Sequence, residues 1–328
     1  MTKDTVLAML RQADGYLSGE QISGSLGVSR AAVHTAVKSL RAEGYDIHSL
    51  TNRGYRLGHA PDRLSRGELL AELSGGRMEH VLCLEEVDST NNRLREWAHR
   101  GAAEGSVVIA NHQRAGKGRL GRRFESPKDQ GVYLSMLLRP TLPPADAATL
   151  TAWVAVAVCR AVEAVCGARP DIKWVNDIVM NGQKLGGVLT ELSAEAESGQ
   201  VQFVVVGIGL NVSQSRDDFP GDIRDMATSL REATGGPVRR ARLAAALIRE
   251  LDRLRDDFPH ARDAYLSAYR QSCLTLGRQV RVLRGGVEKQ GVARGVDERF
   301  ALLVDFSDGT CEALSSGEVS VRGLYGYV

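Results

Sequence analysis

The chain has 328 residues, of which 43% are hydrophobic and 25% charged, a composition that is ordinary for globular proteins and allows more than one domain. Its formal net charge of +2 is too small to indicate a nucleic-acid binder as a whole, so any such activity must come from local clusters of charge. The five cysteines are odd in number, widely spread and without the spacing of metal ligands, which favours a reducing compartment and predicts no metal site.

Residues 1–60 predict a small separate domain, because short helical patterns alternate with glycines. Residues 18–30 indicate a helix, a tight turn at Gly27 and a second helix capped by Ser29, which is a helix-turn-helix pattern. Alternation over residues 45–57 predicts a hairpin, or wing, with a basic tip. The candidate DNA-binding side chains on the second helix and the wing are Arg30, His34, Lys38, Arg41 and Arg53. A protein-interaction module with solvated charges is the alternative.

Residues 61–271 predict a mixed, largely antiparallel sheet with helices on one face, because most consecutive strand patterns have no helix between them. The predicted strands cover residues 81–84, 107–110, 132–138, 172–174 and 201–206, with a further hairpin turning at Asn181-Gly182. The predicted helices cover residues 91–99, 145–166 and 239–257.

The most apolar window, residues 147–166, contains Arg160 and Glu163 and therefore predicts a buried helix rather than a membrane span. The N-terminus shows no apolar signal segment. Together with the cysteine usage, these features lead us to expect a cytoplasmic protein that does not contact a membrane.

Residues 272–328 change to short alternating runs at 279–283, 301–305 and 318–322, separated by turns at Gly285-Gly286 and Asp308-Gly309. This pattern predicts a small β-barrel. Such a barrel is too small to be an active-site domain by itself but is well suited to cap one.

The most informative segment is residues 113–123, where three glycines and five cations follow an apolar run. Gly116, Gly118 and Gly121 match the pattern G-x-G-x-x-G, but no amphipathic helix follows them, so a dinucleotide-binding turn is disfavoured. We interpret the segment as a loop whose backbone approaches a ligand closely while its cations neutralise an anion. A solvated basic surface loop is the alternative, but it has no use for glycines that lose entropy on ordering.

Four other segments carry polar groups where a ligand could use them. Residues 88–92 lie between a strand and a helix, where they can cap the helix or bind a small polar ligand equally well. Residues 173–177 place a cation, a tryptophan and an amide-carboxylate pair on a strand expected to be buried. Lys184 follows a hairpin turn and is a surface lysine by default, but its neighbouring glycines allow a ligand to approach. Residues 207–211 end a strand with two glycines and an amide, a shape suited to packing a base or ribose.

The sequence holds no Walker A loop, no Ser-His-Asp order and no cluster of metal ligands. Charge stabilisation remains as the chemistry that these residue types can supply. Cations and glycines around a polyphosphate favour in-line attack on an α-phosphate, with the protein positioning two reactants and neutralising the developing charge.

These motifs, in this order, resemble those of the bacterial biotin protein ligases, in particular the bifunctional type that also represses biotin-synthesis genes. The family motif G-R-G-R-x-G-R corresponds to residues 116–122, K-W-P-N-D to 173–177, K-x-x-G-x-L-x-E to 184–191, S-T-N to 89–91 and G-x-G-x-N to 207–211. The resemblance covers nearly the whole chain. Two positions depart from it: Lys117 replaces arginine and loses the bidentate fork, and Val175 replaces proline.

The resemblance implies an α+β chain with a winged helix-turn-helix domain at 1–60, a class II synthetase-like catalytic domain at 61–271 and an SH3-like β-barrel at 272–328. It further implies that the carboxylate of biotin attacks the α-phosphate of ATP, accompanied by Mg²⁺, to give biotinyl-5′-AMP. A lysine of an acceptor carboxylase subunit, the biotin carboxyl carrier protein, then displaces AMP.

The resemblance also assigns roles to residues. Lys184 and Arg119 are implied as the catalytic cations. Contacts to biotin or its adenylate are implied for Ser89, Thr90, Asn91, Gln113, Gly116, Lys117, Gly118, Arg119 and Lys184. The nucleotide side is implied for Lys173, Asn176 and Asn211.

For regulation, the resemblance implies a ligand-promoted homodimer that binds two-fold operator DNA. Two other functions compete with this one. A lipoate ligase or octanoyltransferase shares the core fold and the reacting lysine, but usually lacks the glycine-arginine loop. A transcription factor could use the central domain only to sense a ligand, although the presence of Lys184, Arg119 and Lys173 together speaks against it.

Overall fold

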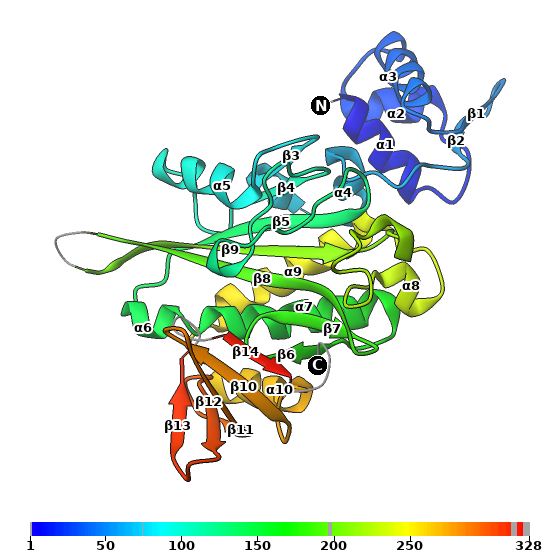
Figure 1. Cartoon of the computed structure of the whole chain (residues 1–328). Helices are drawn as coiled ribbons and strands as arrows, with labels where there is room; N and C mark the ends of the chain where they lie inside the picture. Colours follow the sequence, from blue (N-terminus) through cyan, green and yellow to red (C-terminus); the bar gives the residue numbers. More distant parts are fainter. Residues whose placement is uncertain (1, 74, 196–198, 316–319, 324–328) are drawn as a thin grey trace.

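The N-terminal region of the computed structural model is a winged helix-turn-helix domain (Figure 1). The structure describes residues 2–73, 75–195, 199–315 and 320–323. The elements of this domain are α1 (Thr2–Gln12), α2 (Gly19–Leu26), α3 (Arg30–Ala42), β1 (Ile47–Leu50) and β2 (Gly54–Leu57). Gly27 ends α2 with a φ of 62°, and the Ser29 side chain accepts a hydrogen bond from the backbone N–H of Ala32. The predicted helix-turn-helix and wing are therefore confirmed.

The helix α4 (Arg66–Glu72) joins this domain to the rest of the chain by packing against α1. Gly67 allows the two helices to approach, because a Cβ atom there would lie 2.9 Å from the Leu7 side chain. The buried carboxylate of Glu68 accepts a hydrogen bond from Arg11 of α1 at 2.7 Å. The two regions are thus held together by apolar packing and a largely buried ion pair.

A seven-stranded sheet forms the centre of the molecule, with strand order β3-β4-β5-β9-β8-β7-β6. Its strands are β3 (Val81–Leu84), β4 (Val107–Ala110), β5 (Gly131–Leu138), β6 (Asp171–Lys173), β7 (Asp177–Met180), β8 (Gln183–Ala194) and β9 (Val201–Asn211). The pair β3 and β4 is parallel and all other neighbours are antiparallel. The predicted mixed, largely antiparallel sheet is confirmed.

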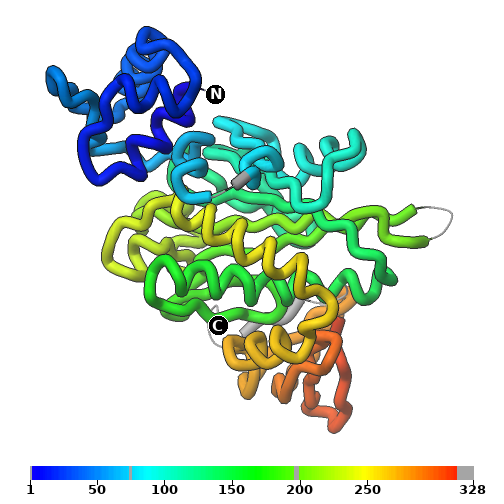
Figure 2. The backbone as a smooth tube through the Cα atoms, turned by 180° about the vertical axis from the view of Figure 1, so that it is seen from behind, coloured from blue at the N-terminus to red at the C-terminus, as the bar shows by residue number. Residues whose placement is uncertain are grey.

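Helices cover both faces of this sheet, so the expectation that they lie on one face is wrong. The long helices α7 (Leu150–Cys166) and α9 (Arg240–Asp257) lie side by side on one face (Figure 2). The helix α5 (Thr90–His99) packs Leu94 and Ala98 on the opposite face, against side chains of β5 and β9. The short α5 covers only part of that face, and the remaining part carries the candidate site.

The predicted helix 145–166 is two helices, α6 (Pro144–Ala147) and α7, with a break at residues 148–149. The stretch Pro144–Cys166 is long and apolar enough to cross a membrane, but 67% of its most apolar window is buried inside the protein. Since α7 packs on α9 and the sheet, it is a core helix, as predicted.

The C-terminal region is a five-stranded antiparallel sheet with order β13-β12-β11-β10-β14. Its strands are β10 (Gln279–Arg284), β11 (Val287–Val296), β12 (Leu302–Phe306), β13 (Cys311–Leu314) and β14 (Ser320–Gly323). The sequence predicted three of these strands and missed β11 and β13. The first two residues of the predicted strand 318–322 lie outside the described residues.

Short elements complete the fold. They are α8 (Leu230–Thr234), α10 (Arg262–Ser272) and the 3-10 turns at Gly75–His80, Arg119–Gly121 and Arg216–Asp218. The turn at Arg119–Gly121 lies in the glycine-basic loop and so belongs to the candidate site.

Candidate active site

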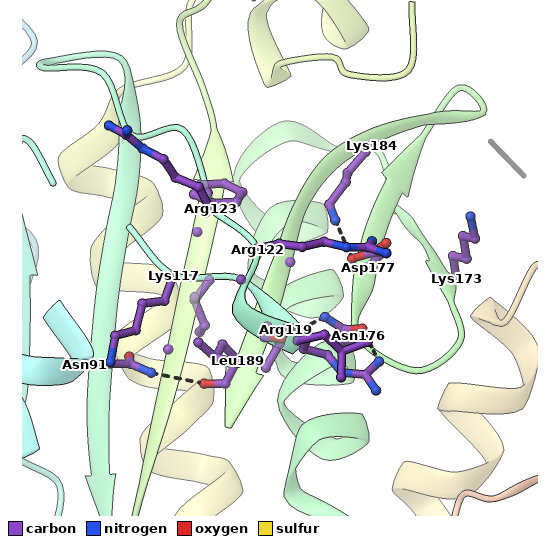
Figure 3. A pocket seen from close by; sticks show the side chains of 18 of the residues that line it. Asn91, Lys117, Arg119, Arg122, Arg123, Lys173, Asn176, Asp177, Lys184 and Leu189 are labelled. Atoms are coloured by element: carbon purple, nitrogen blue, oxygen red, sulfur yellow. Dashed lines mark hydrogen bonds and ion pairs between the residues drawn. The ribbon is translucent and has the colours of Figure 1, made fainter. Parts of the chain in front are cut away.

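A cavity of about 500 Å³ lies on the sheet face that α5 leaves open (Figure 3). It brings together residues from α5, the glycine-basic loop, four strands of the central sheet (β6, β7, β8 and β9) and the C-terminal sheet. The predicted site residues that line it are Ser89, Thr90, Asn91, Gln113, Lys117, Gly118, Arg119, Lys173, Asn176 and Lys184. Segments more than a hundred residues apart therefore meet at one place, as the predicted motifs require.

One end of the cavity is built on the first turn of α5. Gln113 accepts hydrogen bonds from the backbone N–H and the hydroxyl of Thr90, at 2.9 and 3.1 Å. The Ser135 hydroxyl lies 2.6 Å from Oδ1 of Asn91 and fixes the orientation of that amide. Ser89 is the N-cap residue of α5, but its side chain makes no capping hydrogen bond. Capping therefore does not explain why a serine stands at this position.

The carboxylate of Glu191 organises this end electrostatically. It accepts hydrogen bonds from Asn91 at 2.8 Å and Arg95 at 2.5 Å, and it lies 3.5 Å from the ammonium group of Lys117. Burial would raise the pKa of Glu191, but the bond from Asn91 and the two cations outweigh burial and hold the pKa below its usual range. Lys117 is thus partly neutralised here, which suits a ligand group that is polar but not strongly charged.

The glycine-basic loop closes on itself beside this end. The backbone N–H of Gly118 donates to the Arg122 carbonyl at 2.7 Å, and Phe124 donates to Gly116 at 2.9 Å. A Cβ atom on Gly116 would lie 2.4 Å from the Phe124 carbonyl oxygen. Gly116 is therefore required for loop closure, and it is not among the residues that line the cavity. Leu120, at the tip, is 66% exposed.

The other end of the cavity carries the predicted catalytic cations. Lys184 lies on β8 and donates to the Asp177 carboxylate at 2.6 Å, while Arg119 donates to the Asn176 side chain at 3.0 Å. Figure 3 shows that Arg122 also extends toward Asp177. Burial lowers the pKa of the Arg119 guanidinium, and the nearby Asp177 opposes that shift. An anionic ligand would find several cations here that are already oriented by hydrogen bonds.

The floor of the cavity consists of strand glycines. A Cβ atom on Gly207 would lie 2.2 Å from Oδ1 of Asn91, and one on Gly209 would lie 2.6 Å from the Phe124 ring. Only glycine allows Asn91 and Phe124 to lie directly on the sheet. The glycines that were predicted to face a ligand therefore also make room for the side chains that form the walls of the site.

Two residues predicted for the nucleotide side differ in their positions. Lys173 lines the cavity although it is only 9% exposed. Asn211 is buried at the end of β9, donates to the Thr228 carbonyl at 3.0 Å and accepts from Gln214 at 3.2 Å. It holds the turn after β9 and does not line the cavity, so the structure does not support a direct nucleotide contact.

Sequence reasoning missed several lining residues. Asp177, within the predicted motif 173–177, is the only carboxylate among the described residues that line the cavity. Its spacing from Lys184 across a hairpin could have indicated an ion pair. Leu189 and Phe124 belong to predicted motifs or directly follow one, whereas Met226 and Arg281 come from distant segments that carry no local signal.

The helix-turn-helix domain exposes most of the predicted DNA-binding side chains. His34 and Lys38 are exposed on α3, and Arg30 is exposed and paired with Glu20 at 2.7 Å. Arg53 at the wing tip lies over the Tyr16 ring. Arg41 instead donates to the Ile47 carbonyl and to Ser49, so it attaches the wing to α3, and its predicted place among the DNA contacts is not supported.

Three family models match the chain in the same order as its structural regions. Residues 2–56 match a helix-turn-helix domain, residues 83–211 match the biotin/lipoate A/B protein ligase family, and residues 275–322 match the biotin protein ligase C terminal domain. The family matched by residues 83–211 is named for both biotin and lipoate, so this match alone does not identify the substrate.

Curated relatives distinguish between biotin and lipoate as the substrate. The chain is 35% identical over 311 residues to the bifunctional ligase/repressor BirA of Bacillus subtilis, covering 94% of this chain and 95% of the relative. It is 32% identical to the protein of the same name from Escherichia coli, covering 97% and 96% of the two chains.

Among solved structures, a biotin protein ligase from Aquifex aeolicus in complex with biotin and ATP matches with a TM-score of 0.63 and 30% identity. That match covers 74% of this chain and 98% of the Aquifex chain. With its DNA-binding, ligase and C-terminal regions all matched in sequence, the chain belongs to the biotin protein ligase family.

Proposed function

We propose that this protein attaches biotin to a lysine of a carboxylase acceptor domain in two ATP-dependent steps, and that the intermediate biotinyl-5′-AMP also controls its binding to operator DNA. The observation that carries this proposal is the cavity, in which a serine-threonine-asparagine end faces a cation-rich end across a glycine floor. One end suits a neutral polar ring system and the other suits phosphates.

Biotin would bind at the α5 end. Its neutral ureido group needs both donors and acceptors, which the side chains of Ser89, Thr90 and Asn91 offer. Glu191 neutralises part of the Lys117 charge there, so that the uncharged ring is not exposed to an unbalanced cation. The carboxylate of biotin would then extend toward Lys184.

In the first step, a carboxylate oxygen of biotin attacks the α-phosphorus of ATP, and the bond from that phosphorus to the bridging oxygen breaks to release pyrophosphate. Lys184 and Arg119 act as catalytic residues that bring two anions together and stabilise the negative charge that grows on the phosphate. Lys184 would exchange its partner Asp177 for the reacting groups. Arg119 is held by Asn176 before the reaction, so the change of partner at Lys184 is the main rearrangement that this step needs.

ATP would enter as its Mg²⁺ complex, with the ion as part of the substrate. The described residues contain no group of three potential metal ligands, but Mg²⁺ often binds to phosphates and one or two carboxylates. Asp177 offers one carboxylate at the phosphate end, so the residues present fit a nucleotide-borne ion.

In the second step, the neutral amine of the acceptor lysine attacks the acyl carbon of biotinyl-5′-AMP. The bond between that carbon and the phosphate oxygen breaks, AMP leaves, and the amine loses a proton as the amide forms. Leu120 and the loop around it lie at the rim of the cavity, where they can cover the adenylate until the acceptor arrives.

Mass spectrometry of an acceptor domain would test the enzymatic proposal. After incubation with this protein, ATP and biotin, one acceptor lysine is expected to gain the mass of biotin less water. A parallel sample with lipoate should show no adduct, and an acceptor whose target lysine is changed to arginine should stay unmodified. Modification by lipoate, or by neither acid, would overturn the proposal.

The exposed cations of α3 lead to a prediction about DNA. Replacing both Arg30 and Lys38 by alanine is expected to weaken binding to operator DNA from the biotin locus by about tenfold or more, because phosphate contacts and released counterions are lost. Pyrophosphate exchange should remain normal, since neither residue lines the cavity. A fluorescence anisotropy titration at fixed salt would measure the affinity.

The same titration tests the coupling between the two activities. We expect the wild-type protein to form a homodimer and to bind the two-fold operator more tightly with biotinyl-5′-AMP than without it. Equal affinity in the two conditions would contradict the coupling while leaving the ligase proposal intact. Both activities would take place in the cytoplasm, where the acceptor and the DNA are found.

A further inference from the structure

A buried serine lies behind the α5 end of the cavity. Ser135 is in the middle of β5, is 0% exposed and is not among the residues that line the cavity. Its hydroxyl oxygen lies 2.8 Å from Oγ1 of Thr90 and 2.6 Å from Oδ1 of Asn91, and both of these residues do line the cavity. Burying a hydroxyl in an apolar strand costs free energy unless it is hydrogen-bonded, so its place between two lining side chains indicates a role in the site.

The neighbour on one side, Thr90, has its hydroxyl proton committed elsewhere. The amide nitrogen of Gln113 donates to the Ser126 hydroxyl at 2.9 Å, which turns the amide oxygen of Gln113 toward Thr90. That oxygen accepts from the backbone N–H and from the hydroxyl of Thr90, at 2.9 and 3.1 Å. Because a hydroxyl has only one proton, the Thr90 oxygen can act only as an acceptor toward Ser135.

The neighbour on the other side, Asn91, also presents an acceptor. Its amide nitrogen donates to the Glu191 carboxylate at 2.8 Å, so its amide oxygen faces Ser135. The Glu191 carboxylate is paired with Arg95 and can only accept, so the amide cannot turn around without losing this bond. Ser135 therefore has one proton for two acceptors.

This proton count decides what the two acceptors can offer a ligand. The hydroxyl of Ser135 can donate to Asn91 or to Thr90, but not to both. The contact to Asn91 is the shorter of the two, which favours donation to the amide oxygen. Oγ1 of Thr90 can then accept from an N–H group of a ligand at the cavity wall.

We propose that Ser135 is a positioning residue for the ring of biotin: it holds the Asn91 amide in place and leaves the Thr90 oxygen as the acceptor for a ureido N–H. This inference rests on the proposed ligase function. Ser135 lies behind the end of the cavity opposite Lys184, so it touches neither the reacting carboxylate nor the phosphates. Its effect should therefore appear in the affinity for biotin and not in the rate of the chemical step.

Calorimetric titration of Ser135→Ala with biotin tests this role. The variant is expected to bind biotin about three- to tenfold more weakly, because the hydrogen bond to Asn91 is lost and a buried acceptor is left without its donor. In steady-state assays, the KM for biotin should rise by a similar factor while the KM for ATP and kcat stay constant. Unchanged affinity for biotin, or a fall in kcat at saturating biotin, would overturn the proposal.

A double-mutant cycle tests whether Ser135 acts through Asn91. If it does, Ser135→Ala should weaken biotin binding much less in an Asn91→Ala background than in the wild type, because the group that it positions is already gone. Equal effects in the two backgrounds would contradict positioning through Asn91.

Ser106→Ala is the matched control, because Ser106 is also 0% exposed and its hydroxyl has no hydrogen-bond partner among the residues that the structure describes. It should bind biotin as the wild type does. A comparable loss of affinity in both variants would show a general effect of removing a buried hydroxyl and would overturn the role of Ser135. Failure of the wild type to bind biotin would instead refute the ligase function.

Discussion

Replacing Lys184 by alanine is expected to slow biotin-dependent pyrophosphate release by about 100-fold or more, because the reaction loses a positioned cation at the growing negative charge. The Lys184 backbone is fixed on both sides: its N–H donates to the Met226 carbonyl at 2.7 Å, and its carbonyl accepts from Thr228 at 2.9 Å. The ammonium group is thus placed by β8 and residues 226–228 rather than by a mobile surface loop. Exchange of labelled pyrophosphate into ATP would measure the effect.

The same substitution should change stability little, because the Lys184 side chain is 34% exposed and ion pairs of this kind contribute at most about 1 kcal/mol. Lys128→Ala is a suitable control, since Lys128 is exposed and is not among the residues lining the cavity. It should exchange pyrophosphate as the wild type does. A normal rate in Lys184→Ala would refute the catalytic role, and a large loss of thermal stability would show that the lysine is structural.

The sequence could predict much of this site because its chemistry occurs in short local motifs. Ser89, Thr90 and Asn91 follow a strand and begin a helix, so their position at a strand-helix junction could be predicted from the local sequence. Lys184 follows a two-residue turn, so its place on a hairpin could also be predicted from the local sequence. These motifs needed only the sheet to bring them together.

Features that depend on tertiary contacts were not predictable in this way. Gly116 and Asn211 stand in ligand-binding motifs, but the structure uses them to close a loop and to hold a turn. Arg281 reaches the cavity only because another domain attaches to the segment around Trp174. The two faces of a sheet cannot be assigned from the order of helices, which is why α5 was expected beside α7.

The strand β11 was missed for a different reason. Most outward positions of β11 are charged, polar or glycine, and the run from Glu288 to Gly291 contains no hydrophobic residue. Gly291 is needed because a Cβ atom there would lie 2.6 Å from the Asp305 carbonyl oxygen of the neighbouring strand. Because a glycine is needed where the two strands approach closely, the alternation of hydrophobic and polar residues that identifies a strand in sequence is lost here.

Arg240→Met is expected to lower the free energy of unfolding of the ligase domain by about 1 to 3 kcal/mol, because it removes a fully buried guanidinium that is the hydrogen-bond donor to the buried Asn111 and to the partly exposed carboxylates of Asp62 and Asp129. Arg240 begins α9, is 0% exposed and donates to the Asp62 side chain at 3.0 Å. It also donates to the side chains of Asn111 at 3.2 Å and Asp129 at 3.3 Å. The substitution keeps an apolar stem of similar length but leaves two carboxylates and an amide without their donor.

The neighbouring Arg239 provides the matched control. Its side chain is 44% exposed and pairs with Glu68 and Glu72, each at 3.2 Å. Because Glu68 keeps its bond to Arg11, Arg239→Met should cost only about 0 to 1 kcal/mol. Urea denaturation of both variants, followed by a probe in the ligase domain, would measure the difference. Equal losses would contradict the prediction and would mean that the network at Arg240 relaxes or admits water when its cation is removed.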